Sequence, residues 1–277
     1  MIDRIKRLVR YVRYGLPVVK NIKSELHIHY LQPNGRLQGK KILLTGGSRG
    51  IGYAMAKKFI EEGAEVIISG RDENKLKEAA KTLYCKYMPY DLMKIDGIDS
   101  FIQNAEDLLN GIDVLVNNAG VSLHEKDYSD VTQTTFDTQI NTNLKAPFFL
   151  AQAFIKNLID KQRKGCVLFI SSETGETVDI RPYGWTKSII NSYVQGLAYR
   201  LRTNNIRVNA ICPGVTATEM TGYDEKGNLY VDGTNERIYL PNEMAEIATF
   251  LVSDASILLN GQILVCNEGK TINARWR

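Results

Sequence analysis

The chain has 277 residues, of which 44% are hydrophobic, and a formal net charge of +4. This length supports one sizeable core rather than two full domains, and no run of 18 apolar residues predicts a transmembrane helix. The basic excess is local, because residues 1–40 carry a net charge of +7 and residues 41–277 carry −3. We therefore expect no nucleic-acid-binding function for the slightly acidic body.

Apolar runs of strand length alternate with segments of helical periodicity after residue 40. Strands are expected at 41–46, 64–70, 85–91, 112–120, 165–172, 206–214 and 261–269. Helices are expected between them at 52–63, 72–83, 100–111, 136–161, 183–202 and 241–254, the long segment at 136–161 containing a proline. Repeated strand–helix units with short loops predict a three-layer, doubly wound α/β fold with a parallel sheet of about seven strands. We expect residues 39–277 to form this single domain and residues 1–38 a basic helical arm.

The stretch "KILLTGGSRGIG", residues 41–52, ends a buried strand with spaced glycines. Gly46 permits a tight turn, and Gly50 and Gly52 remove side chains that would block a diphosphate and the packing of the following helix. The free N–H groups at the start of that helix attract an anion. Any tight strand-to-helix turn favours glycine, but a position between the first strand and the first helix favours a dinucleotide site.

This glycine spacing resembles that of the short-chain dehydrogenase/reductase family, and the similarity runs from about Gly39 to Gly269. Six further motifs follow in the family's order: "YDL" at 90–92, "NNAG" at 117–120, "NTNLKAPFF" at 141–149, "ISS" at 170–172, "YGWTK" at 183–187 and "PGVTATEM" at 213–220. The resemblance implies a Rossmann fold, a nicotinamide cofactor and oxidoreductase activity. The cofactor-binding residues that it implies, with the two arginines discussed below, are Gly46, Ser48, Arg49, Gly50, Ile51, Gly52, Arg71, Asp91, Leu92, Asn118, Ala119, Gly120, Tyr183, Lys187, Pro213, Gly214, Val215, Thr216 and Thr218.

Tyr183 and Lys187 stand four residues apart, which places them on one face of a helix. A free phenol has a pKa of about 10, and we expect the nearby ammonium to lower it toward acid–base work. By resemblance, Tyr183 gives a proton to a carbonyl oxygen and Lys187 holds the nicotinamide ribose. Ser172 binds the substrate oxygen, and Asn143 holds a water in a proton relay.

The interval from Ser172 to Tyr183 is 11 positions, about two fewer than is usual in the family. Ser171 therefore stays a rival for the substrate-orienting serine.

NADP(H) is favoured as the cofactor, and NAD(H) is not excluded. Binders of NAD place an acid after the second strand to hold the ribose diol, but here Gly70 occupies that position and Arg71 follows it. Arg49 lies in the adjacent glycine loop, so two guanidinium groups are available to a 2′-phosphate. Asp72 leaves the preference open, because it comes one residue later.

The expected reaction is reduction of a ketone to a secondary alcohol, or its reverse, as in 3-oxoacyl-[acyl-carrier-protein] reductases. A sugar or polyol dehydrogenase and a catalytically silent NADP(H) sensor are the alternatives. The segment expected to cover the substrate, residues 221–241, is polar, which favours a polar or carrier-attached carbonyl compound. By resemblance we also expect a homotetramer, or a dimer, formed through the two long helices.

The four cysteines are widely spaced, which predicts reduced thiols, no metal site and a cytoplasmic protein. In the arm, apolar residues lie along one side of the expected helix and most arginines along the others. This pattern predicts a helix that packs on the body or on a neighbouring subunit. Peripheral contact with an anionic membrane is the less favoured alternative.

Overall fold

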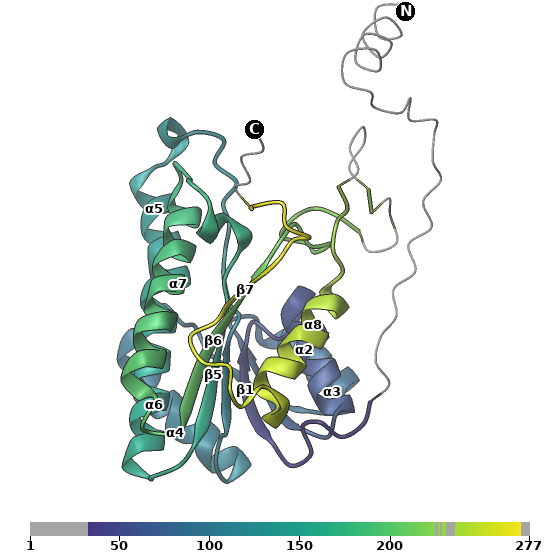
Figure 1. Cartoon of the computed structure of the whole chain (residues 1–277), viewed down its shortest axis with the longest axis vertical. Coiled ribbons are helices and arrows are strands. Elements are labelled where there is room, and N and C mark those ends of the chain that lie inside the picture. The colour runs from purple at the N-terminus through teal and green to yellow at the C-terminus, as the bar shows by residue number, and fades with distance from the viewer. Residues whose placement is uncertain (1–32, 225–226, 228, 231–235, 273–277) are drawn as a thin grey trace, which may run out of the picture. The chain divides into compact units, whose positions relative to one another are not determined.

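A seven-stranded parallel sheet forms the centre of the computed structural model, which describes residues 33–224, 227, 229–230 and 236–272. Its strand order is β3-β2-β1-β4-β5-β6-β7, so the order in which strands are added reverses between β3 and β4, which lies on the other side of β1. Figure 1 labels β1, β5, β6 and β7 of this sheet between its helices. Neighbouring strands are in parallel register, for example Leu43 opposite Ile67 on one side and Leu115 on the other. The strands are β1 (Lys41–Thr45), β2 (Glu65–Gly70), β3 (Lys86–Pro89), β4 (Val114–Asn117), β5 (Gly165–Ile170), β6 (Ile206–Pro213) and β7 (Ile263–Cys266).

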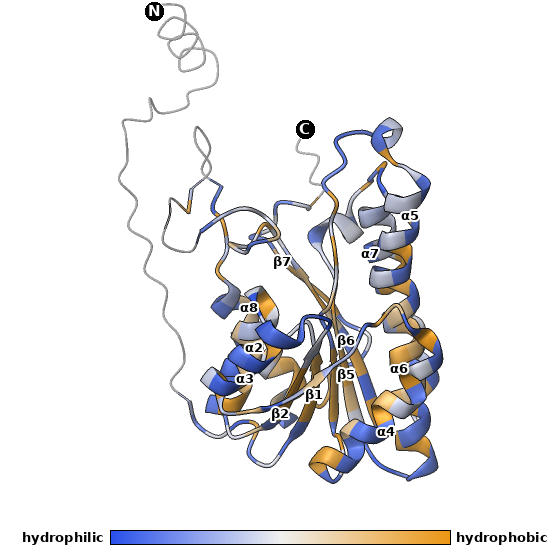
Figure 2. Cartoon of the chain, turned by 180° about the vertical axis from the view of Figure 1, so that it is seen from behind, coloured by the Kyte–Doolittle hydropathy of each residue, from blue (hydrophilic) through white to orange (hydrophobic). Residues whose placement is uncertain are grey.

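Helices cover both faces of this sheet, as the near-continuous apolar strands predict. One face packs against α2 (Gly50–Glu61), α3 (Glu73–Leu83) and α8 (Pro241–Val252), and the other against α4 (Ile98–Leu109), α6 (Ala146–Asp160) and α7 (Pro182–Leu201). Figure 2 shows the apolar strands enclosed between these layers, with hydrophilic residues on the outer helix surfaces. The predicted three-layer doubly wound fold is confirmed.

The long helix expected at 136–161 is instead three helical segments in one run. It consists of α5 (Gln133–Ile140), a π-helical segment at Asn141–Lys145, and α6. Pro147 explains a break here, because it has no N–H to donate to the carbonyl of Asn143 four residues earlier. Single π-helical turns often occur at functional sites, and this one carries a predicted site residue.

Residues 34–37 pack on the body, although the expected division placed them in the arm. Leu37 is fully buried, and the backbone N–H groups of Asn34 and Arg36 both donate to the Glu62 carboxylate at 3.1 Å. The Arg36 guanidinium pairs with Glu62 and, at 3.0 Å, with Glu246 of α8. The body therefore begins several residues before the expected boundary at residue 39. Residues 1–32 of the predicted arm, including its amphipathic helix, lie outside the described residues.

Two general expectations can be compared with the structure. All four cysteines lie in the described part of the chain and carry free thiols. Within that part, no helix has both the length and the apolar character needed to cross a bilayer.

Candidate functional site

The glycine loop between β1 and α2 lies at the carboxyl ends of the strands, next to the end of β4. Gly46 has φ +70°, and a Cβ there would meet the Asn118 side chain at 2.9 Å. A Cβ on Gly52 would come within 2.0 Å of the carbonyl oxygen of Gly46. Gly50 has φ +55° and faces the Thr218 methyl group. Each of the three predicted glycines thus has a steric or conformational reason to be glycine.

The N-terminus of α2 has the free donors that a diphosphate requires. Arg49, the residue before the helix, makes no side-chain capping hydrogen bond, and the first turn contains no acidic residue. By contrast, the carboxylate of Asp72 caps α3. The backbone N–H groups that begin α2, including those of Gly50 and Ile51, therefore suit an anion that the protein itself does not supply. The residues at this loop fit the diphosphate of a dinucleotide.

Thr45, directly before Gly46, joins the glycine loop to β4 and was not among the predicted site residues. Its buried hydroxyl accepts hydrogen bonds from the backbone N–H groups of Asn118 and Ala119, both at 3.1 Å. The Asn118 side chain donates in turn to the carbonyls of Thr45, at 2.9 Å, and Gly46, at 3.1 Å. The only sequence signal for this role was the position of a hydroxyl residue at the end of a strand.

The residues expected at the adenosine end lie after β1, β2 and β3. Arg71 follows β2 directly and is exposed. Asp72 is held as the N-cap of α3, where its Oδ1 accepts from the Lys75 N–H at 3.0 Å. Asp91 and Leu92 are half-buried just beyond β3.

Arg49 does not stand free beside Arg71, because its guanidinium forms an ion pair with Glu219 in the loop after β6. Ser48, its neighbour in the glycine loop, is half-buried.

The predicted catalytic side chains meet where β5 ends and α7 begins. Lys187 is 6% exposed; its Nζ donates to the Ile170 carbonyl at 3.0 Å and lies 5.5 Å from the centroid of the Tyr183 ring. The Ser172 hydroxyl lies close enough to the Tyr183 hydroxyl to lower the pKa of the phenol. Tyr183 itself is half-buried. A proton donor, a cation and a second hydroxyl therefore share one small volume.

The two rival serines have different partners. The Ser171 hydroxyl is buried and donates to the backbone carbonyl of Lys187 at 3.3 Å. Ser172 instead accepts from the Thr174 hydroxyl at 3.0 Å and from the Thr174 N–H at 3.3 Å, in addition to its contact with Tyr183. Thr174, which sequence reasoning missed, orients the Ser172 hydroxyl.

Asn143 lies in the π-helical segment and is 2% exposed. Its Oδ1 accepts from the Val121 N–H, and its Nδ2 donates to the Val121 carbonyl, both at 2.8 Å. These two bonds hold the chain just beyond Gly120, where a Cβ would lie 3.3 Å from Asn143 Oδ1 and 3.7 Å from Lys187 Nζ. The structure thus brings Asn143, Gly120 and Lys187 together.

The loop after β6 completes the site. Pro213 and Gly214 are buried, and a Cβ on Gly214 would meet the Tyr239 ring at 2.6 Å. Tyr239 also holds this loop through its backbone, because its N–H donates to the Val215 carbonyl at 2.9 Å and its carbonyl accepts from Ala217 at 2.8 Å. Val215 is exposed, Thr216 is buried and Thr218 is half-buried. Of the expected substrate-covering segment, residues 225–226, 228 and 231–235 lie outside the described part.

The expected lowering of the Tyr183 pKa is wrong for this structure. Burial raises the pKa of Tyr183, and the hydrogen bond from Ser172 opposes that rise only in part. Burial also lowers the pKa of Lys187 to about 8. The four-residue spacing correctly placed the Lys187 ammonium near Tyr183. It contains no information on burial, and desolvation disfavours both the Lys187 ammonium and the Tyr183 phenolate. At neutral pH the phenol is therefore protonated.

Replacement of Lys187 by Met is expected to change how stability depends on pH. The folded-state pKa of Lys187 is about 8 and its ordinary value is 10.5, so between these values the unfolded chain binds more protons at this residue. The free energy of unfolding of the unmodified protein should then rise relative to Lys187→Met by about 2–3 kcal/mol from pH 7 to pH 10. Urea denaturation at both pH values measures this, and parallel profiles would contradict the assigned burial.

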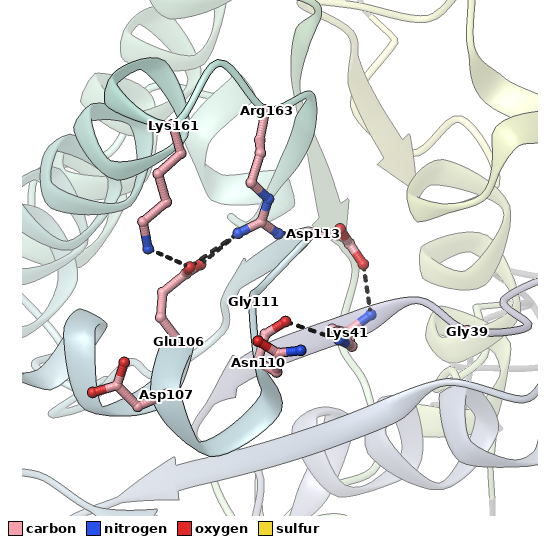
Figure 3. Close-up of a pocket in the computed structure, with 9 residues that line it drawn as sticks. All are labelled: Gly39, Lys41, Glu106, Asp107, Asn110, Gly111, Asp113, Lys161 and Arg163. Carbon is pink, nitrogen blue, oxygen red and sulfur yellow. Dashed lines mark hydrogen bonds and ion pairs between the residues drawn. The ribbon is translucent and has the colours of Figure 1, made fainter.

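A separate hollow of about 630 Å³ lies at the amino ends of β1 and β4, at the opposite end of the strands from the candidate site (Figure 3). Buried Glu106 accepts from Lys161 at 2.8 Å and from Arg163 at 2.9 Å, and Arg163 also pairs with Asp113 at 3.3 Å. The Lys41 ammonium donates to the Asn110 carbonyl at 2.9 Å. These charged side chains form ion pairs and hydrogen bonds that link the segment before β4 to the segment before β5. We therefore assign the hollow a structural role.

Comparisons with known proteins match most of this chain to one family. The family profile described as short chain dehydrogenase matches residues 40–228. The 3-oxoacyl-[acyl-carrier-protein] reductase FabG of Chlamydia trachomatis is 34% identical over 247 residues, which cover 85% of this chain and 99% of the relative. Gluconate 5-dehydrogenase of Gluconobacter oxydans is 30% identical over 249 residues, covering 86% of this chain and 96% of the relative.

Solved structures share the fold over a similar length. The crystal structure of gox2181 superposes with a TM-score of 0.78 at 27% identity and covers 86% of this chain and 98% of its own. A short-chain type dehydrogenase/reductase from Mycobacterium marinum gives a TM-score of 0.76 at 27% identity, with 85% and 97% covered. With the glycine loop and the Tyr183–Lys187 pair in place, the chain belongs to the short-chain dehydrogenase/reductase family and is an NAD(P)-dependent oxidoreductase.

Proposed function

We propose that this chain is an NADPH-dependent reductase that converts a ketone to a secondary alcohol, or catalyses the reverse reaction. The observation that carries the proposal is the meeting of Ser172, Tyr183 and Lys187 beside a glycine loop whose helix N-terminus is uncapped. Intact acid–base residues argue against a silent sensor, because binding alone requires no proton donor.

The chain's own residues handle the proton and the substrate oxygen. When bound, the reduced nicotinamide supplies a hydride to the carbonyl carbon. The Tyr183 hydroxyl donates its proton to the carbonyl oxygen, which becomes the alcohol, and Ser172 orients that oxygen by a hydrogen bond. Lys187 stabilises the resulting phenolate and hydrogen-bonds the nicotinamide ribose, while Asn143 holds a water that returns a proton through Lys187. Residues 213–218 and 118–120 would hold the nicotinamide, and the N–H groups of Gly50 and Ile51 would bind the diphosphate.

The preference for NADP(H) is supported by the partners of Asp72. A carboxylate that grips the ribose diol has to be available after β2, but Asp72 is committed to the N-cap of α3. Arg71 is exposed at the end of that strand. A guanidinium there binds a 2′-phosphate through charge-assisted hydrogen bonds.

The Arg71→Glu variant is expected to weaken NADPH binding about 10- to 100-fold, the effect of losing hydrogen bonds to a charged group. NADH binding should change little, because NADH has no phosphate at this position. Titration of cofactor fluorescence measures both dissociation constants. Lys77→Glu, which reverses an exposed charge on α3, is the control. Equal losses for the two cofactors would contradict the assignment.

The substrate class is proposed from the relatives and from the polar composition around the site. Matched relatives include several 3-oxoacyl-[acyl-carrier-protein] reductases, at 31–34% identity. A carrier-attached 3-oxoacyl group is therefore our first candidate. The similarity to gluconate 5-dehydrogenase supports a sugar or polyol as the second.

A panel of oxo-substrates tests the proposed function. Purified protein, NADPH and either 3-oxoacyl thioesters, oxidised sugar acids or simple ketones are mixed, and the absorbance of the reduced cofactor is followed. We expect turnover with at least one 3-oxoacyl thioester. Faster turnover of the sugar acids would favour the second candidate, and no turnover with any ketone despite NADPH binding would contradict a reductase.

We further propose that the chain forms a homotetramer, or a dimer, through α6 and α7. Trp185, Ile189 and Tyr199 of α7 expose 44%, 47% and 72% of their surface, as does 41% of Ile159 on α6. Exposed apolar side chains gathered on helices mark contact surfaces. Light scattering measures the state in solution, and a monomer would contradict this part. We also propose that the protein is located in the cytoplasm.

A further inference from the structure

An ion pair links the two loops at the proposed cofactor site. Arg49, in the glycine loop after β1, pairs with Glu219, in the loop after β6. The same loops meet a second time, because a Cβ on Gly50 would lie 3.3 Å from the Thr218 methyl group. Two adjacent residues of one loop therefore lie next to two adjacent residues of the other.

Glu219 is held in place by a tightly hydrogen-bonded turn. The Thr221 hydroxyl accepts from the Thr218 N–H at 3.2 Å and contacts the Thr218 carbonyl at 3.1 Å. The Gly222 N–H donates to that same carbonyl at 3.0 Å. The turn fixes the backbone on both sides of Glu219, which places this residue beside Arg49.

Another anion can readily replace Glu219 in its ion pair with Arg49. The Arg49 and Glu219 side chains are 56% and 66% exposed, and ion pairs in water contribute little stability. A phosphate dianion offers a guanidinium a stronger, forked set of acceptors than one carboxylate does. A phosphate ester that reaches Arg49 can therefore replace Glu219 as its partner.

We propose that Glu219 is a specificity-determining residue that competes with the 2′-phosphate of NADP(H) for Arg49. This inference rests on the proposed NADP(H) preference. The carboxylate weakens 2′-phosphate binding in two ways, by occupying the guanidinium and by repelling the incoming dianion. The carboxylate does not change the affinity for a nucleotide that lacks this phosphate. Glu219 therefore reduces the difference in affinity between NADPH and NADH.

Calorimetric titration of the full chain with adenosine 2′,5′-bisphosphate and with 5′-AMP tests this competition. Glu219→Gln should bind the bisphosphate about two- to fivefold more tightly than the unmodified chain, the range expected for removing an exposed ion pair. Its affinity for 5′-AMP should not change. The gain should shrink as salt is added, because exposed charges are screened.

Glu61→Gln is the matched control, because it removes one exposed carboxylate from the far end of α2. It should leave the affinity for the bisphosphate unchanged. If Glu219→Gln binds the bisphosphate equally or more weakly while the unmodified chain prefers it to 5′-AMP, the competition is overturned and the proposed function survives. If the unmodified chain binds neither nucleotide, or both equally, the NADP(H) preference fails together with this inference.

Discussion

Tyr183→Phe is expected to lower kcat for ketone reduction by about 10²- to 10⁴-fold, the usual contribution of a positioned general acid. The substitution removes one hydroxyl from a half-buried ring and leaves the helix intact. Because the hydroxyl contacts Ser172 rather than the glycine loop, NADPH binding should persist. Absorbance of the reduced cofactor gives kcat, and cofactor fluorescence gives the dissociation constant.

Tyr193→Phe on the same helix is the control for this variant. The Tyr193 hydroxyl donates to the Phe148 carbonyl at 3.5 Å, and its ring stacks on Phe148, on the side of α6. Loss of that hydroxyl should leave kcat nearly unchanged. Turnover by Tyr183→Phe at the level of Tyr193→Phe would exclude Tyr183 as the proton donor.

Gly52→Ala is expected to have the second large effect, on cofactor binding and stability together. The added Cβ would lie 2.0 Å from the Gly46 carbonyl oxygen and 2.5 Å from the Asn118 amide. The nearest atom belongs to the backbone, so the loop itself has to move. Overpacking of this kind costs about 1–3 kcal/mol of unfolding free energy. The backbone N–H groups at the start of α2 would also be displaced, so the protein should lose most of its affinity for NADPH.

Gly196→Ala supplies the matched comparison within a helix. A Cβ at Gly196 in α7 would meet no atom within 4 Å apart from its chain neighbours and the backbone of its own helix. Alanine there should raise the free energy of unfolding by about 0.5–1 kcal/mol, because glycine disfavours helix interiors. Thermal unfolding with and without NADPH measures both variants. Equal stabilisation of the two by NADPH would contradict the role given to Gly52.

The fold was predictable because its signals are local and repeated. Each strand is an apolar run and each helix an apolar stripe, so periodicity located nearly all of them. The glycine loop and the Tyr183–Lys187 spacing were equally visible, since both depend on residues close together in the chain. The resemblance to a family then supplied the roles of Ser172 and Asn143, which no local pattern indicates.

The remaining features depend on contacts between distant segments. No pattern around Asn143 showed that its amide would bind the Val121 backbone, or that the helix would change to π-helical geometry there. Likewise, Arg49 was visible as a loop charge, but its partner Glu219 stands 170 positions later. Periodicity carries no information on such pairs.

Burial accounts for the one electrostatic error. Spacing placed an ammonium beside a phenol, which by itself lowers the pKa of the phenol. The structure buries Lys187 beside the end of β5 and partly buries Tyr183, and desolvation then lowers the pKa of Lys187 and raises that of Tyr183. The size of a desolvation effect depends on the complete fold, which a four-residue spacing does not contain.

A crystal structure of the unmodified chain with NADPH tests the central claim most directly. We expect the diphosphate at the N-terminus of α2 and the nicotinamide between residues 213–218 and Lys187, with the Tyr183 hydroxyl facing the same space. A nucleotide bound elsewhere, or a Tyr183 hydroxyl directed away from the nicotinamide, would contradict it.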